Sequence, residues 1–507
     1  MSVQEQPLDA LSTDHLKADL KGRSVRGGLL TLTSQGTQFL IQSVSTVVLA
    51  RLLTPADFGL VAMVSAITVV ASGFADLGLS EATIQRREIT HDQVSTLFWI
   101  NVAVGLALTL ITAASAPLFA RFYRDGRLVN VTLLLSLTFL IGGFRVQPDA
   151  LLKRQMRFSS LAFRDITASA LAVFVSIFMA WRGAGYFALL ALPLTMYSVQ
   201  MAFSWLMVKW RPSLPRRDAE VGSMVKFGGN VAASYLTINL NRSIDNVLVG
   251  WYWGATPLGL YSRAYNLLML PVRQLSAPAG SVAIPAFSRL QNEPERFAQY
   301  YLRAVNLIMW IATPIFGFLF VAANPVIVLT LGNQWREAAP VFQILVISAL
   351  GQLLLESTLW LFVSRGQPKR LLKLMLVISP IIVVSFVIGL PFGIKGVALS
   401  GSLVLIAIFP WILRFAFRGT TITLQLIGRA LLYPMVTCLV AVCFGRLALR
   451  LIAPERIIPQ LLVVALGFAT AYLCSALIPA VREEVTSFGR ILNDLRFPGR
   501  AAAPTAQ

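Results

Sequence analysis

The sequence predicts an all-α polytopic membrane protein with about fourteen transmembrane helices, arranged as two pseudo-symmetric six-helix lobes followed by two further helices. Apolar runs of roughly twenty residues recur between short loops, and a helix of that length crosses a hydrocarbon core ~30 Å thick. Hydrophobic residues make up 56% of the chain and charged residues only 13%. Because backbone polar groups must be satisfied inside lipid, such long apolar runs are typical of helices and not of alternating barrel strands.

The apolar runs define the predicted helices in chain order. They occupy residues 28–50, 58–76, 94–116, 128–147, 161–181, 185–208, 227–250, 258–285, 304–325, 339–363, 371–391, 396–417, 430–449 and 459–480. Helices 1 and 8 are the least hydrophobic of them. The N-terminal segment has no apolar h-region, which argues against a cleaved signal peptide.

Loops and composition divide the chain into expected segments. These are a cytoplasmic N-tail (1–27), an N-lobe (28–208), a cytoplasmic inter-lobe loop (209–226), a C-lobe (227–417), a pair of further helices (418–480) and a cytoplasmic C-tail (481–507). The two lobes resemble each other. A shift of 200 residues without a gap superposes Gly28, Ser34, Thr37, Leu40, Ser43, Val47 and Gly59-Leu60 on Gly228, Ser234, Thr237, Leu240, Ser243, Val247 and Gly259-Leu260. Six helices preserve orientation, so the repeat is parallel and predicts a substrate path between the lobes.

The formal net charge of +20 follows the predicted topology. Loops and tails expected on the inner side hold about three times as many Lys and Arg as the outer loops, which is a positive-inside bias. Both termini are therefore predicted to be cytoplasmic, in a multi-pass protein of the cytoplasmic (inner) membrane. Because topology explains the basic residues, we do not expect nucleic acid as a partner.

No motif indicates catalysis or a bound cofactor. Cys438, Cys443 and Cys474 have no CxxC spacing and lie in apolar runs, and His15 and His91 fall in a tail and a loop. No nucleotide-binding glycine loop is present, and Asp57 in RLLTPADFG has no acidic partner in the sequence. We expect no enzyme, no catalytic residue, no metal and no cofactor.

Polar residues at membrane depth are the candidate substrate-binding groups. Helix 7 carries Asn241, Arg242 and Asp245, and the matching helix 1 offers Gln42 and the terminal Arg51. Because a charge at the bilayer centre costs roughly 3 kcal/mol, such residues usually face a wet cavity or a partner. An internal Arg242–Asp245 ion pair with a structural role is the alternative.

Arginines on other helices could bind phosphate oxygens bidentately. Arg263 and Arg273 lie on helix 8 and Arg145 on helix 4, although Arg145 and Arg273 lie nearer the inner ends and could instead extend to the interface. Asp76, Asp245 and Glu356 are the membrane acids that could couple transport to a proton or a sodium ion. Glu81 and Asp165 sit at helix ends, where solvation is expected.

Helix 8 also has prolines at a seven-residue spacing, Pro271, Pro278 and Pro285. Proline removes a backbone hydrogen bond and kinks a helix. The pattern predicts either a permanently bent helix or a moving hinge.

Three segments carry a resemblance to a known family. LARLLTPADFGLVAM, DNVLVGWYWGATPLGLYSRAYNLLMLPV and IPAFSRLQ resemble bacterial polysaccharide-repeat flippases of the multidrug/oligosaccharidyl-lipid/polysaccharide exporter superfamily, near its exopolysaccharide and colanic-acid branch. The resemblance runs from about Gly22 to Arg482. It implies a V-shaped cavity that opens alternately to each side, and an undecaprenyl-diphosphate-linked oligosaccharide as the substrate.

The resemblance also implies partners and residues. The partners are the lipid-linked substrate, the bilayer, and the polysaccharide polymerase and export machinery. Arg263 matches a cavity arginine of helix 8 in this superfamily, whereas helix 1 departs from the pattern with glutamines and only Arg51. Asp245 matches one ligand of a sodium site in one branch, but the expected helix 11 acid is absent, so that site is not carried over.

Two other functions remain as alternatives. A multidrug or small-molecule exporter of the same superfamily would need an acidic cavity for cations, whereas helices 7 and 8 are richer in arginine. A membrane glycosyltransferase or polymerase would need a large outer loop with catalytic carboxylates, which the sequence lacks.

The charge distribution alone predicts the topology. Reporter fusions after Pro212 and after Gln507 should behave as cytoplasmic, and fusions near Arg124 and Asn333 as periplasmic, because the positive loops stay inside. A periplasmic C-terminus would mean that the helix count is wrong by one and that the two-lobe interpretation fails.

Overall fold

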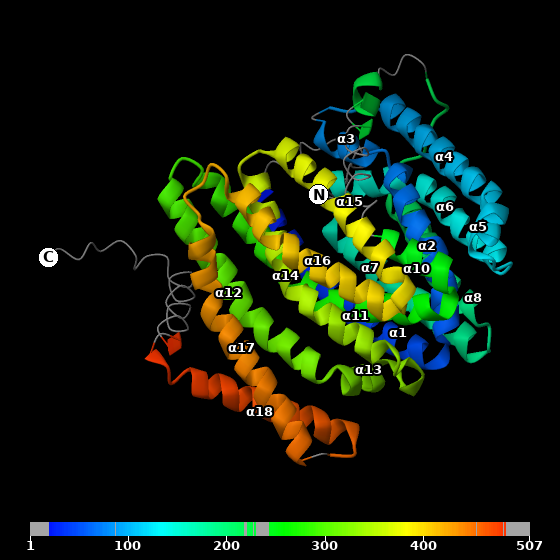
Figure 1. The fold of residues 1–507 in the computed structure, drawn as a ribbon. Coiled ribbons are helices and arrows are strands. Elements are labelled where there is room, and N and C mark those ends of the chain that lie inside the picture. The colour runs from blue at the N-terminus through cyan, green and yellow to red at the C-terminus, as the bar shows by residue number, and fades with distance from the viewer. Residues whose placement is uncertain are drawn as a thin grey trace, which may run out of the picture. The chain divides into compact units, whose positions relative to one another are not determined.

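The fold is that of a computed structural model, which describes residues 20–86, 88–216, 221–226, 228–229, 243–452, 454–479 and 481–482 (Figure 1). The described residues form helices and no strand, which confirms the all-α class. Ten helical stretches among them are long and apolar enough to cross a membrane, and one of these, Pro368–Phe417, contains two helices. The number of fourteen spans stays a prediction, since part of the predicted 227–250 span lies outside the described residues.

The helices follow the predicted order with short additional ones between them. They are α1 (Leu20–Leu52), α2 (Pro55–Ala75), α3 (Leu79–Gln85), α4 (His91–Ala114), α5 (Ala116–Tyr123), α6 (Leu128–Arg154), α7 (Phe158–Trp181), α8 (Tyr186–Met207), α10 (Ile244–Trp253), α11 (Ala255–Arg289), α12 (Pro294–Val321), α13 (Ala323–Leu331), α14 (Ala338–Ser364), α15 (Pro368–Gly389), α16 (Gly393–Phe417), α17 (Leu424–Ile452) and α18 (Ile457–Ser475). The short helices α3, α5 and α13 were not predicted. α11 continues as one helix through its three internal prolines.

Local sequence explains where the N-lobe helices begin. Thr54 caps α2, because its hydroxyl accepts the amide of Asp57 at 3.3 Å while the Asp57 carboxylate accepts the Thr54 amide at 3.0 Å. Thr90 and Gln93 form the same reciprocal capping box at α4. These pairs satisfy orphan amides of the first turn. Asp57, which had no acidic partner in the sequence, is a helix-capping residue.

The chain divides into two compact units, of which unit 1 ends at Ser262 and unit 2 begins at Arg263. This division falls inside α11, whereas the predicted lobes divide at residues 209–226. The lobe boundaries therefore stay a prediction.

In unit 1, glycines bring α4 and α6 together (Figure 1). A β-carbon at Gly105 would lie 2.6 Å from the carbonyl oxygen of Phe139, and one at Gly143 would lie 2.7 Å from that of Asn101. Membrane helices lack a hydrophobic drive to associate, so close backbone approach through small residues supplies the van der Waals contact.

A second glycine contact in unit 1 is reciprocal. A β-carbon at Gly59 would overlap the carbonyl oxygen of Ala255, and one at Gly259 would overlap that of Pro55. The 200-residue shift found in the sequence pairs Gly59 with Gly259 and Pro55 with Ala255. A contact in which each partner repeats the other's interaction is what a local two-fold axis produces. The N-terminal ends of α2 and α11 therefore meet as equivalent elements.

The predicted inter-lobe loop packs onto unit 1 along its described residues. Trp210 is buried, the Trp99 indole donates to the Ser213 carbonyl at 2.8 Å, and Arg216 pairs with Asp92 at 2.8 Å. These contacts attach the loop to the first turns of α4.

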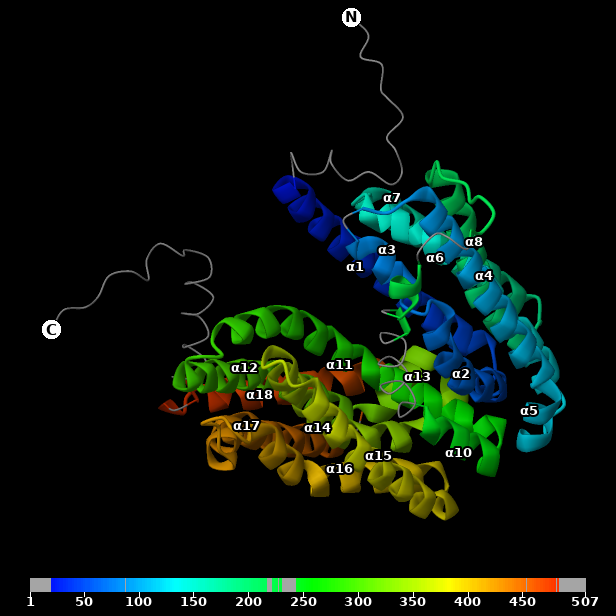
Figure 2. The same ribbon diagram turned by 90° about the horizontal axis from the view of Figure 1, so that it is seen from above.

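Unit 2 is built around α12 and α14. α12 packs on α14 and α17, α17 on α18, and α15 beside α16 (Figure 2). The hydroxyls of Tyr301 on α12 and Ser357 on α14 lie 3.0 Å apart, and Tyr301 belongs to a large apolar cluster of this unit. A β-carbon at Gly389 would lie 2.6 Å from the carbonyl oxygen of Gly396, so the turn between α15 and α16 is as tight as the glycine contacts of unit 1.

The α4–α6 contact predicts a sharp difference between adjacent glycines. Gly143→Ala should lower the free energy of unfolding by about 1–3 kcal/mol, because the added methyl overlaps the Asn101 carbonyl and forces the helices apart. Gly142→Ala is the matched control and should be neutral, since nothing lies within 4 Å of its added β-carbon. Thermal unfolding of the purified protein in detergent measures both. Equal melting temperatures would show that the helices do not depend on this contact.

Candidate functional site

The predicted site residues occupy very different environments. Asn241 and Arg242 lie outside the described residues. On α1, Gln42 is exposed and Arg51 is exposed in the last turn. Their substrate-binding role stays a prediction.

Asp245 is buried at the start of α10, with an exposed fraction of 6%. Its carboxylate accepts the Tyr261 hydroxyl at 3.0 Å and the Asn246 amide at 2.8 Å. The first turn of a helix favours a negative charge. The carboxylate therefore ties α10 to α11, and the predicted alternative pair with Arg242 lies outside the described residues.

Arg263 is half-buried on α11. It follows the helix start at Ala255 by about two turns, or roughly 12 Å at 1.5 Å per residue. Because successive helical residues are rotated by about 100°, Arg263 lies on the opposite face of α11 from Tyr261. Its position is therefore separate from the Asp245–Tyr261 contact.

The remaining membrane acids differ in how they are bound. The Asp76 carboxylate follows α2 and accepts the Ser80 amide at 3.0 Å and the Ser80 hydroxyl, so it caps the first turn of α3. The Ser80 hydroxyl also lies 2.8 Å from the carboxylate of Glu81. Glu356 on α14 is half-buried, and its carboxyl forms no hydrogen bond or ion pair with any residue that the structure describes.

A network of charged and polar side chains joins α6, α7 and α8, and the sequence did not predict it. Arg164 on α7 is 4% exposed and pairs with Asp149 of α6 and with Asp165, which lies 2.7 Å away. The Ser204 hydroxyl of α8 donates to Asp149 at 2.6 Å, and the Gln200 amide donates to Asp165 at 3.0 Å. Asp165 is therefore bound within the protein, and the expectation that it is solvated was wrong.

Arg145 belongs to the same network. Its guanidinium donates to Gln200, its Nε lies 3.6 Å from a carboxylate oxygen of Asp149, and it lies 5.1 Å from the centre of the Tyr197 ring. These contacts direct Arg145 toward α8. Its predicted substrate-binding role stays a prediction, but its charge is already matched inside unit 1.

A second buried chain of hydrogen bonds attaches α3 to α4 and α6. Asn101 donates to the Asp76 carbonyl at 3.1 Å, and Gln147 donates to Asn101 at 3.0 Å. Thr83 donates to Gln147 at 2.9 Å, and the Arg154 guanidinium donates to the Thr83 carbonyl at 2.9 Å. Since buried amides and hydroxyls are costly when unpaired, this series of hydrogen bonds fixes the position of the short helix α3.

These networks can hold helices together, and they contain no arrangement typical of catalysis. Within the described parts of the chain, no group of three or more His, Cys, Asp or Glu side chains could bind a metal ion. The only sequence signal for the first network was the four-residue spacing of Arg145 and Asp149, which places both on one face of α6. The partners on α7 and α8 have no such signal.

Comparisons with known proteins give a consistent family. The family described as "Polysaccharide biosynthesis protein" matches residues 48–340. The Bacillus subtilis (strain 168) "Teichuronic acid biosynthesis protein TuaB" is 27% identical over 336 residues, which cover 65% of this chain and 68% of that protein. The Escherichia coli (strain K12) "Lipopolysaccharide biosynthesis protein WzxC" is 26% identical over 313 residues, which cover 61% and 63%.

Two kinds of solved structure share the fold. The structure titled "Lipid II flippase MurJ, inward closed conformation" superposes with a TM-score of 0.69 at 12% identity, covering 89% of this chain and 99% of that one. An inward-facing multidrug resistance MATE family transporter of the MOP superfamily superposes with a TM-score of 0.59 at 16% identity, covering 76% and 96%. At these identities the likeness concerns the fold.

The Arg164 network predicts a large effect on stability. Arg164→Gln should lower the free energy of unfolding by about 3 kcal/mol, because it removes the buried cation that Asp149 and Asp165 share and leaves only Arg145, 3.6 Å from Asp149, as a nearby positive charge. Adding Asp149→Asn should recover part of the loss, since one uncompensated charge is removed. Arg182→Gln, at the exposed C-terminal end of the same helix, is the control and should change little. An Arg164→Gln protein as stable as the parent in detergent would contradict the structural role of the network.

Proposed function

We propose that this chain, which belongs to the polysaccharide biosynthesis protein family, is a flippase that moves undecaprenyl-diphosphate-linked oligosaccharide repeats from the inner to the outer leaflet of the cytoplasmic membrane. The observation that carries the proposal is the family match over more than half of the chain, in a fold made of membrane-length helices. The named relatives act in the biosynthesis of teichuronic acid and lipopolysaccharide, and the lipid II flippase shares the fold. The proposed process is a translocation with no covalent chemistry.

The substrate itself requires such a protein. A headgroup of sugars and diphosphate carries polar and charged atoms that hydrocarbon cannot solvate, at a cost of several kcal/mol for each charge. The lipid tail has the opposite requirement and stays in the bilayer. A polar path with an opening toward lipid satisfies both requirements. Gln42, Asn241, Arg242 and Arg263 are the polar residues that we propose as ligands of the headgroup.

Alternating access requires parts that move as rigid bodies. The Arg164 network joins α6, α7 and α8 through charged hydrogen bonds, and Asn101 and Gln147 join α4 to α6. Bonds of this kind support a unit whose helices move together. The rocking motion would then leave the interior of unit 1 intact.

The surroundings of the three membrane acids, Asp245, Asp76 and Glu356, indicate which of them could couple transport to an ion. Asp245 already accepts two hydrogen bonds, and Asp76 caps α3. Glu356 has no such partner within the described residues, so of the three it is the group we propose to exchange a proton or a sodium ion. Both termini are proposed to be cytoplasmic, with the polysaccharide polymerase and export machinery as partners.

Arg263 is the proposed diphosphate ligand. It is half-buried in a membrane helix, away from either end, where lipid solvates a charge poorly and an anionic substrate would interact favourably with it. A guanidinium binds two phosphate oxygens at once, in a geometry that an ammonium cannot reproduce.

The proposal predicts a graded series at this position. Arg263→Ala should abolish glycan export while protein abundance stays near normal, and Arg263→Lys should recover only part, because it keeps the charge and loses the bidentate geometry. Lipid-linked repeats should accumulate in the inner leaflet, measured in membranes from cells that carry the variant.

The matched control is Arg289→Ala, in the exposed last turn of the same helix, which should export normally. Normal export by Arg263→Ala at parental abundance would exclude the diphosphate role. It would leave Arg263 as a structural residue of α11.

A further inference from the structure

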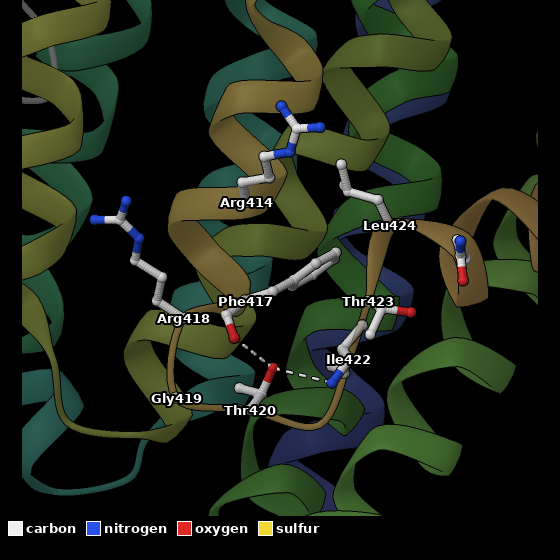
Figure 3. A pocket seen from close by; sticks show the side chains of 9 residues that line it. Arg414, Phe417, Arg418, Gly419, Thr420, Ile422, Thr423 and Leu424 are labelled. Atoms are coloured by element: carbon white, nitrogen blue, oxygen red, sulfur yellow. Dashed lines mark hydrogen bonds between the residues drawn. The ribbon is translucent and has the colours of Figure 1, made fainter.

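A pocket of about 440 Å³ lies in unit 2 where α16 ends and α17 begins (Figure 3). Its lining comes entirely from the segment between Arg414 and Gln425. The topology predicted from charge places this connection on the cytoplasmic side, at the level where lipid headgroups lie.

The rim of the pocket is cationic. Arg414 and Arg418 both line it, both are exposed, and Figure 3 shows their side chains extending away from the turn. No lining residue is acidic. Neither arginine forms an ion pair with any side chain in the described ranges, so both charges are available to a ligand.

Neighbouring arginines neutralise the backbone carbonyls at the C-terminal end of α16, beside the pocket. Arg365 donates to the Gly419 carbonyl at 2.7 Å, and Arg370 donates to the Phe415 and Arg418 carbonyls at 2.8 and 3.1 Å. These carbonyls are the negative end of the helix dipole and would otherwise repel an anion. Burial, and after it the charge of Arg370, lower the pKa of the Arg365 guanidinium, as expected where positive charge is concentrated.

The inner wall of the same pocket is apolar. Phe417 and Ile422 are buried, with exposed fractions of 5% and 4%, and Leu424 lies beside them (Figure 3). Earlier in α16, before its C-terminal end, the exposed Trp411 stacks on Phe415 with ring centres 5.9 Å apart. Exposed tryptophan is enriched at the membrane interface. The pocket therefore combines a cationic rim with an apolar wall at headgroup depth.

We propose that this pocket binds the phosphate group of a membrane lipid, with Arg414 and Arg418 as its ligands. Basic pockets between membrane helices on the cytoplasmic side match the phosphate and glycerol parts of a lipid headgroup. The phosphate has two possible sources, an anionic phospholipid of the bilayer or the diphosphate of a lipid-linked sugar. Only the second source rests on the proposed flippase function.

Native mass spectrometry of the full-length protein tests the site. The parent protein should bind phosphatidylglycerol in preference to phosphatidylcholine. Arg414→Gln with Arg418→Gln should weaken phosphatidylglycerol binding by about tenfold or more, since each hydrogen bond to a charged group is worth roughly one decade of affinity. Arg450→Gln is the control, because Arg450 is exposed in the last turn of α17, at the opposite end of that helix, and should leave binding within about twofold.

A competition experiment separates the two sources. Undecaprenyl diphosphate that displaces phosphatidylglycerol from the parent, and loses binding in the double variant, would assign the site to the substrate. Phosphatidylglycerol that stays bound to the parent in the presence of undecaprenyl diphosphate would assign the site to phospholipid. Unchanged phosphatidylglycerol binding by a folded double variant would overturn the proposal, as would a parent with no preference for phosphatidylglycerol.

Two further variants keep these outcomes distinct. Arg414→Lys with Arg418→Lys retains both charges and should bind at least partly, which separates loss of charge from loss of fold. Arg263→Ala should keep phosphatidylglycerol binding even where export is lost. Failure of the flippase proposal and failure of this site are therefore separate results.

Discussion

The absence of hydrogen-bonding solvent in the membrane is the constraint on which this structure depends. Every backbone amide and carbonyl must find a partner inside the protein, and helices are the solution for an open chain. Side chains obey the same rule. Arg164 reaches Asp149 and Asp165, and the Asp76 carboxylate caps α3. A polar side chain at membrane depth therefore pairs with another group of the protein, or else it faces water or substrate.

Lipid also removes the hydrophobic force that would drive helices together, so contact depends on shape. Glycines provide that shape in unit 1, between α4 and α6 and between the ends of α2 and α11. The reciprocal contact of Gly59 and Gly259 is informative because the same residues carry the internal repeat. A duplicated sequence that meets its own copy needs a small residue on both sides, which explains why the glycine appears in each half.

Much of the fold could be predicted from the sequence, because hydrophobic length is a strong local signal. The predicted 128–147 span lies within α6, and 339–363 within α14. The short helices α3 and α13 were missed, since they are too short to produce a membrane-length run. The partners of Arg164 were missed for a different reason: Asp149 and Ser204 lie on other helices, and tertiary packing brings them together. Periodicity identifies which face a residue occupies, but it does not identify the neighbour.

The arginines have different roles according to the groups that surround each of them. Arg164 faces carboxylates in the interior of unit 1, so its charge is neutralised and holds helices together. Arg365 and Arg370 face backbone carbonyls, so they terminate α16 and keep their positive charge. Arg414 and Arg418 lie on the same turn as those capped carbonyls, and no residue that lines their pocket is acidic. The capping arginines thus make the rim more positive than its own side chains alone would, because the helix end that would have offset them is already occupied.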